Sequence, residues 1–125
     1  DKAGAGVTIT GSQLTSNIAG PDGTAAPGNG GAVHISGAGT VTVDATIVSR
    51  NHAAKEGGGL WNSSAGVMTV QRSTICKNTS PKGAGVFSQA GNGDLSLTNS
   101  TISGNEASNT GGGLHCQSPA SDRCK

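Results

Sequence analysis

Four asparagines recur at a near-constant interval along this chain. Asn51, Asn78 and Asn105 follow one another every 27 residues, and Asn17 precedes Asn51 by 34. Each asparagine stands after a short alternating apolar stretch and before a glycine-rich segment. A fixed period of this length is typical of stacked units that cannot bury their apolar faces alone. The repeat therefore predicts a solenoid, and it is stronger evidence for the fold than the secondary-structure propensity of any short segment.

Within each repeat, apolar residues alternate with polar ones. In the second repeat Val41 and Val43 flank Thr42, Val48 marks a second apolar centre, and Leu60 a third. A period of two indicates strands, and parallel crossovers are right-handed by default. We expect an all-β fold: a right-handed parallel β-helix of about four coils, with three strands per coil.

The repeat boundaries suggest one β-helix domain over residues 1–125, with the four coils in 7–114. The first repeat is about seven residues longer than the others, and the extra residues fall in a Pro- and Gly-rich segment. We expect a loop insertion at 18–29 in the first coil and a C-terminal cap at 115–125.

Three cysteines divide between the cap and the coils. Cys116 and Cys124 flank the tail QSPASDR, and a disulfide between them would fold the tail over the open core. Such a bond fits an oxidising, secreted setting, although spacing alone does not fix connectivity. Cys76 follows an inward position and is expected to face outward as a free thiol.

The asparagine column is expected to be structural. Asn tolerates the left-handed backbone of a sharp corner, and stacked amides can hydrogen-bond along the axis. A glycan or metal role is the alternative. The column consists of Asn17, Asn51, Asn78 and Asn105. Gly30, Gly57, Gly83 and Gly111 form a second column, where we expect positive φ and close backbone approach.

Short motifs around these columns carry a family resemblance. The segments LTSN, VSRN, ICKN and ISGN, paired with GGAV, GGGL, GAGV and GGGL, resemble the FxxN and GGA[ILV] repeats of chlamydial polymorphic outer-membrane proteins. Similar repeats occur in other bacterial right-handed β-helix surface proteins. This chain has aliphatic residues where the FxxN motif has Phe. The resemblance implies an extracellular β-helix, often an adhesin passenger, and carries over no catalytic residue.

One outward column gathers the aromatic residues of the chain. It consists of His34, Trp61, Phe87 and His115. Adjacent members would lie about 4.8 Å apart, close enough to stack. We treat this column as a candidate binding surface for a sugar ring, a peptide or another subunit, with simple self-packing as the alternative. His34 and His115 would stand three coils apart, so we expect no metal site.

The acidic residues do not suggest catalysis. Asp44 has no acid above or below it in this register, and Glu56 aligns with Lys82 as a surface ion pair. His52 and Glu106 share a column but are separated by Thr79. Because no nucleophile, base and orienting group coincide, we expect a non-enzyme without cofactors.

A threonine-rich column raises an alternative function. The outward residues Thr8, Thr42, Thr69 and Ser96 form a regular set resembling the ice-binding faces of β-helical antifreeze proteins. The neighbouring set, Thr10, Asp44, Gln71 and Thr98, breaks that regularity. Outward Thr is also ordinary on a solvated strand.

Charge and hydropathy narrow the choice of partners. The net charge is +1 with scattered Lys and Arg, so we expect no nucleic-acid partner. No apolar run reaches the roughly 18–20 residues of a membrane span, so we expect no membrane insertion. We predict a non-catalytic extracellular or cell-surface module for adhesion, binding a carbohydrate or protein surface. A self-stacking fibre subunit, associating end to end or through the aromatic face, and a remnant of a polysaccharide-processing β-helix are further alternatives.

Overall fold

The computed structural model describes residues 4–20 and 28–117, and these residues contain strands and no helix. The sixteen strands are β1 (Gly6–Thr10), β2 (Gln13–Thr15), β3 (Ile18–Ala19), β4 (Val33–Ile35), β5 (Thr40–Asp44), β6 (Ile47–Ser49), β7 (His52–Ala53), β8 (Leu60–Asn62), β9 (Val67–Gln71), β10 (Thr74–Cys76), β11 (Thr79–Lys82), β12 (Val86–Ser88), β13 (Asp94–Thr98), β14 (Thr101–Ser103), β15 (Glu106–Thr110) and β16 (Leu114–Cys116).

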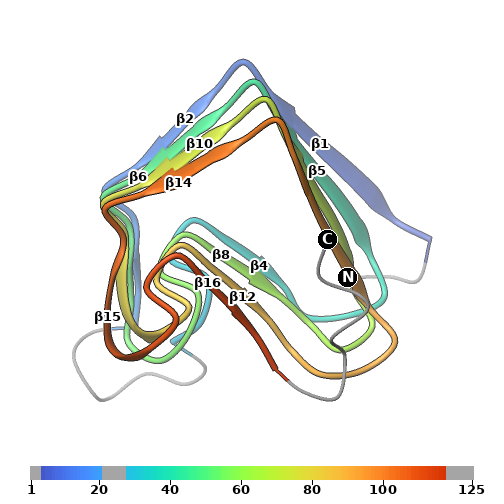
Figure 1. Cartoon of the computed structure of the whole chain (residues 1–125). Helices are drawn as coiled ribbons and strands as arrows, with labels where there is room; N and C mark the ends of the chain where they lie inside the picture. The colour runs from blue at the N-terminus through green and yellow to red at the C-terminus, as the bar shows by residue number, and fades with distance from the viewer. Residues whose placement is uncertain (1–3, 21–27, 118–125) are drawn as a thin grey trace.

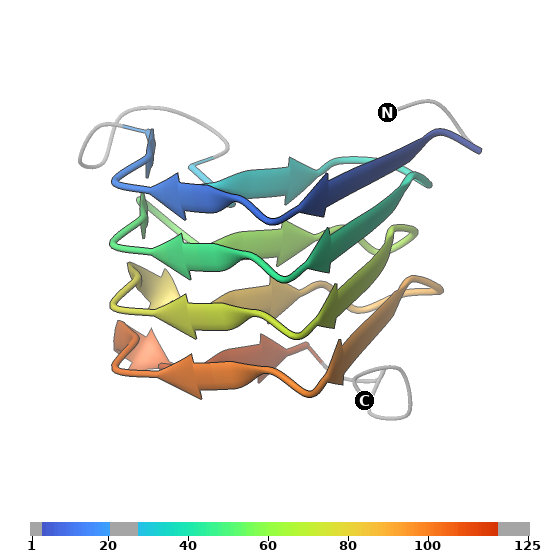
Figure 2. The same ribbon diagram turned by 90° about the horizontal axis from the view of Figure 1, so that it is seen from above.

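The strands form four parallel sheets of four strands each. Sheet A has the order β1-β5-β9-β13, sheet B β2-β6-β10-β14, sheet C β3-β7-β11-β15 and sheet D β4-β8-β12-β16. Each coil therefore contributes one strand to every sheet, and the coils lie one above another (Figure 2). In Figure 1 the chain runs counterclockwise while it advances from the pale, distant first coil toward the viewer. The solenoid is right-handed, as expected.

The register between coils confirms the repeat. Val41 pairs with Val7 in the coil before and with Met68 in the coil after, and Met68 pairs with Leu95. The four expected coils are present. Each coil has four strands, however, where the sequence predicted three. The additional sheet C follows the asparagine column, and its inward residues include the small Ala53 and Ser80, which give no large-apolar periodicity to detect.

The core is a narrow apolar column along the axis. It contains Ile35, Val41, Val43, Val48, Leu60, Met68, Val70, Ile75, Val86 and Leu95. Burial is greatest in the middle coils, since the equivalent Val7 in the first coil is 54% exposed. The alternating pattern read from the sequence is thus the pattern of burial.

Two expected segments are only partly described. Ile18–Ala19 form β3, and Asn29 makes a bridge to Glu56, so both ends of the expected loop insertion belong to the coil. Residues 21–27 between them lie outside the described part. Leu114–Cys116 form β16, and the rest of the expected cap, 118–125, also lies outside it.

Candidate functional site

The aromatic column is a continuous stack on the outer side of sheet D. Ring centroids lie 4.4 Å apart between His34 and Trp61, 6.3 Å between Trp61 and Phe87, and 5.1 Å between Phe87 and His115, all nearly parallel. Trp61 is 6% exposed and Phe87 1%. Each inner ring therefore has its two faces covered by its neighbours.

The edges of these rings are also in contact with the protein. Trp61 Nε1 donates to Glu56 Oε2 at 3.2 Å, and His34 Nδ1 donates to the Asn29 carbonyl at 3.1 Å. Glycines precede the rings in each coil, and a Cβ on Gly57 would lie 2.9 Å from the Trp61 Cβ. The packing fits the self-packed alternative, and a binding role for this column stays a prediction.

The asparagine column forms a hydrogen-bonded ladder through all four coils. Nδ2 of Asn17, Asn51 and Asn78 each donates to Oδ1 of the asparagine one coil further on, at 2.9 Å in every case. That same Oδ1 accepts the backbone N–H of the preceding asparagine at 2.9–3.0 Å. Nδ2 of Asn51 donates a second bond to the Leu14 carbonyl. This bonding satisfies buried amides and supports the structural interpretation.

The backbone at this corner corrects one detail of that interpretation. The left-handed residue is the one before each asparagine: Ser16, Arg50, Lys77 and Gly104 have φ of 56–58°. The asparagines were expected to adopt this conformation themselves. They instead close the corner with their side chains, since the amide bonds to the next coil hold the turn that the preceding residue makes.

A second ladder, which the sequence analysis missed, closes the corner between sheets A and B. The backbone N–H of Thr46 donates to Ser73 Oγ at 3.1 Å, and that of Ser73 to Ser100 Oγ at 3.2 Å. Each hydroxyl also donates to the carbonyl two residues earlier. The 27-residue spacing of Thr46, Ser73 and Ser100 was the signal available, but hydroxyl residues are common enough in this chain to conceal it.

The threonine column lies in register on the outer face of sheet A. Thr8 pairs with Thr42, Thr42 with Thr69, and Thr69 with Ser96. Thr8 is exposed, and the other three are half-buried. The adjacent column is irregular, as expected, because Asp44 there pairs with Gln71. An ice-binding role for this face stays a prediction.

Asp44 is held by an arginine from the next coil. Arg72 Nε donates to Asp44 Oδ1 at 2.9 Å, and a second guanidinium nitrogen binds Oδ2. The hydrogen bond from Arg72 lowers the pKa of the Asp44 carboxyl below its ordinary value, and Asp44 raises the pKa of Arg72. The sequence did not predict this pair; the ion pair that it did predict is also present, with Lys82 Nζ 3.8 Å from Glu56 Oε1.

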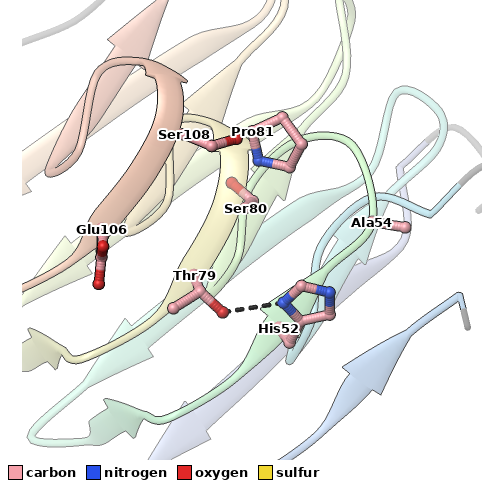
Figure 3. A pocket seen from close by; sticks show the side chains of 7 residues that line it. All are labelled: His52, Ala54, Thr79, Ser80, Pro81, Glu106 and Ser108. Carbon is pink, nitrogen blue, oxygen red and sulfur yellow. Dashed lines mark hydrogen bonds between the residues drawn. The ribbon is translucent and has the colours of Figure 1, made fainter. Parts of the chain in front are cut away.

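A groove of about 470 Å³ crosses the outer face of sheet C. It is lined by His52, Ala54, Thr79, Ser80, Pro81, Glu106 and Ser108, which come from the second, third and fourth coils. Figure 3 shows His52, Thr79 and Glu106 in one row and Ala54, Pro81 and Ser108 in another. The structure thus brings together the column that the sequence placed around Thr79, and beside it adds a row of two apolar residues and one serine.

The groove brings an imidazole, a hydroxyl and a carboxylate into one row. His52 Nδ1 lies 2.8 Å from Thr79 Oγ1, and Glu106 pairs with Thr79 from the other side. Thr79 therefore separates the imidazole from the carboxylate. In the described part of the chain, no three His, Cys, Asp or Glu residues gather where they could hold a metal ion. The non-enzyme prediction stays a prediction.

The cysteines are described in part. Cys76 is a free, half-buried thiol in β10, in register with Ser49 and Ser103. Cys116 is half-buried in β16, in register with Ser88. Because Cys124 lies outside the described residues, the pairing of Cys116 with Cys124 stays a prediction.

Comparison with known proteins identifies one repeat. Residues 99–117 match the Chlamydia polymorphic membrane protein repeat, a segment that spans β14, β15 and β16 of the fourth coil. No curated protein and no solved structure matches the chain. None of the described residues forms a helix able to cross a membrane. The repeat match and the parallel solenoid together fit a β-helix repeat protein similar to the polymorphic membrane proteins.

Proposed function

We propose that this β-helix is a non-catalytic, surface-exposed module that binds a carbohydrate or protein partner, in the manner of an adhesin. The observation that carries the proposal is the matched repeat at 99–117 within a solenoid of regular coils. That repeat is named for membrane proteins of Chlamydia, and a cell-surface location follows by similarity.

The geometry of the solenoid supports the same function. The Asn17–Asn105 ladder and the Thr46–Ser100 ladder tie every coil to the next, which makes the outer faces rigid. A rigid face needs little ordering on binding, so more of its contact energy appears as affinity. The groove on sheet C supplies polar and apolar groups side by side, as ligand sites commonly do.

The proposal is tested by attaching the purified chain to beads and measuring their retention on cell layers and on polysaccharide-coated surfaces under flow. We expect retention by the folded chain and none by the variant Asn51→Ala/Asn78→Ala, in which the central ladder is removed. Equal retention of both proteins, or of neither, contradicts the proposal.

A further inference from the structure

We infer that the groove on sheet C binds a linear, neutral polysaccharide lying parallel to the solenoid axis; this inference rests on the proposed binding function and specifies its ligand. The groove runs across three successive coils, through β7, β11 and β15. A ligand that fills it therefore crosses the strands. Equivalent groups in the groove recur about every 4.8 Å, the spacing of neighbouring strands.

The polar row offers different hydrogen-bonding groups at this spacing. It is in strict register, since Thr79 pairs with His52 in the coil before and with Glu106 in the coil after. An imidazole, a hydroxyl and a carboxylate provide both donors and acceptors. His52 Nδ1 and Thr79 Oγ1 already share a hydrogen bond at 2.8 Å. Sugar hydroxyls donate and accept alike, so a chain of sugars can use the remaining hydrogen-bonding capacity of the Thr79 hydroxyl and the acceptors of Glu106.

The second row is apolar in the second and third coils and polar in the fourth, where it has Ser108. Ala54 and Pro81 lie two positions beyond His52 and Thr79, and both are half-buried. A pyranose ring has hydroxyls at its edge and C–H groups on its face, which matches a polar row beside an apolar one. In the first coil the column of His52 continues with Ile18, which pairs with His52 and is 72% exposed, so the polar row ends there at an apolar side chain.

The backbone beside Pro81 is irregular in a way that shapes the groove. The pairing of β11 with β15 shifts between Ser80 and Lys82, so that Ser80 faces Ala107 but Lys82 faces Thr110. Proline has no N–H for the ladder and is found at such bulges. A bulge bends its strand and redirects side chains, here those of β15 that line the groove.

An extended peptide fits this groove poorly. Peptides that add to sheets use a free strand edge, and β11 already has β7 and β15 on its two sides. A peptide lying across the strands would advance 3.2–3.4 Å per residue against a coil spacing of about 4.8 Å. The polar groups of such a peptide would therefore not match the spacing of His52, Thr79 and Glu106 beyond the first coil.

Among the described Asp, Glu, Lys and Arg residues, Glu106 alone lines the groove, and its carboxylate favours a neutral glycan over an acidic one. Glu106 is exposed at one end of the polar row, and it repels carboxylate or sulfate groups at close range. Arg50 and Lys77 are exposed residues at the start of sheet C, two positions before His52 and Thr79. These two cations could instead attract polyanions by charge alone, and the test below includes that outcome.

The test is a calorimetric titration of the folded chain with neutral oligosaccharides of six or more sugars, such as linear β-glucan and mannan fragments, and with polygalacturonate and heparin as polyanions. The groove variants are Thr79→Val, which removes one hydroxyl, and Ala54→Arg, which fills the apolar row. Thr69→Val makes the same change as the first variant on sheet A and is the matched control. Circular dichroism and Trp61 fluorescence check that each variant is folded.

We expect at least one neutral glycan to bind, with affinity falling about tenfold in Thr79→Val and beyond detection in Ala54→Arg, and unchanged in Thr69→Val. Three results overturn the inference: no glycan bound, neutral glycans bound equally by the groove variants, or polyanions alone bound with loss in Arg50→Gln/Lys77→Gln. If beads carrying the chain are still retained on cells in those cases, the binding function stands and only its ligand is wrong.

Discussion

Asn78, like Asn51 in the coil before it, uses its whole side-chain amide in the hydrogen bonds of the ladder. It is fully buried, donates to Asn105 Oδ1 and to the Val48 carbonyl, and accepts from the N–H and Nδ2 of Asn51. Losing that side chain leaves buried donors and an acceptor without partners, and each such group costs about 1–3 kcal/mol.

We therefore expect Asn78→Ala to lower the free energy of unfolding by at least about 3 kcal/mol in urea titrations. Asn17→Ala is the control, because Asn17 is exposed and its side chain enters the ladder through one bond, from Nδ2 to Asn51 Oδ1. Its loss should lower the free energy of unfolding by about 1 kcal/mol. Similar losses in the two variants would show that the ladder does not hold the middle coils.

The Asp44–Arg72 pair makes the free energy of unfolding depend on pH in the acid range. The pKa of Asp44 is lower in the folded protein than in the unfolded chain, where it is about 3.9. Its stabilising contribution is complete above that value and is lost as the pH falls through the lowered folded pKa. We expect Asp44→Asn to flatten this part of the pH dependence, measured as the urea midpoint between about pH 5 and pH 2.

Arg72→Gln provides the matching control for the acid prediction. Once the guanidinium is gone, the first cause of the Asp44 shift is removed. Asp44→Asn should then leave the urea midpoint nearly unchanged in the Arg72→Gln background. A full effect of Asp44→Asn in that background would mean that another group controls the Asp44 carboxyl.

At the scale of the strands and turns, the glycines between sheets C and D set how closely the coils approach. A Cβ on Gly58 would lie 2.4 Å from the Ala84 carbonyl oxygen and 2.5 Å from that of Thr79. Both atoms belong to the backbone of the next coil, so they cannot move aside alone. The turn therefore excludes every side chain at this position.

We expect Gly58→Ala to destabilise the protein by about 1–3 kcal/mol or more, the usual range for overpacking. Gly104→Asn is the control: Gly104 has φ +58°, and a Cβ there would meet only Lys77 Cγ at 3.9 Å. Lys77 and Arg50 hold the equivalent position in other coils at the same φ. Thermal unfolding should leave the control within a few degrees of the parent, and an equal shift in both variants would refute the close-approach argument.

The elements also show which parts of the fold were predictable. Sheets A, B and D follow from inward Val, Leu, Ile and Met at a period of two, and the register follows from the spacing of Asn51 and Asn78. Sheet C could not be predicted in this way because small residues such as Ala53 and Ser80 face inward there. The groove on sheet C was hidden for the same reason, although its polar column was visible.

The aromatic column shows the opposite case. Its register was correctly predicted, since Trp61 pairs with His34 and Phe87 pairs with Trp61. The burial of its rings was not predicted. The rings are buried because the glycine turn of each coil packs against them, and the repeat pattern does not reveal that contact. The repeat predicts which side chains point away from the core. Whether those side chains are exposed to solvent depends on whether a neighbouring turn covers them.

At the scale of the whole molecule, each coil touches only its neighbours, so stability is close to a sum over coil interfaces. The middle coils have two neighbours and contain most of the buried apolar residues. We expect hydrogen–deuterium exchange to be slowest in β5–β12 and faster in β1–β3 and β13–β15. Uniform protection across all sixteen strands would contradict a solenoid whose coils contribute separately.

The central claim is that residues one period apart lie directly above one another, and paired cysteines test it most directly. In a Cys76→Ser background, Thr42→Cys/Thr69→Cys places thiols on adjacent strands of sheet A, within the Cα separation of 4.4–6.8 Å that a disulfide needs. Thr42→Cys/Ser96→Cys places them two coils apart, at roughly twice the strand spacing. Mass spectrometry after mild oxidation should find the first disulfide formed and the second absent; equal yields, or the second disulfide alone, would contradict the stacked register.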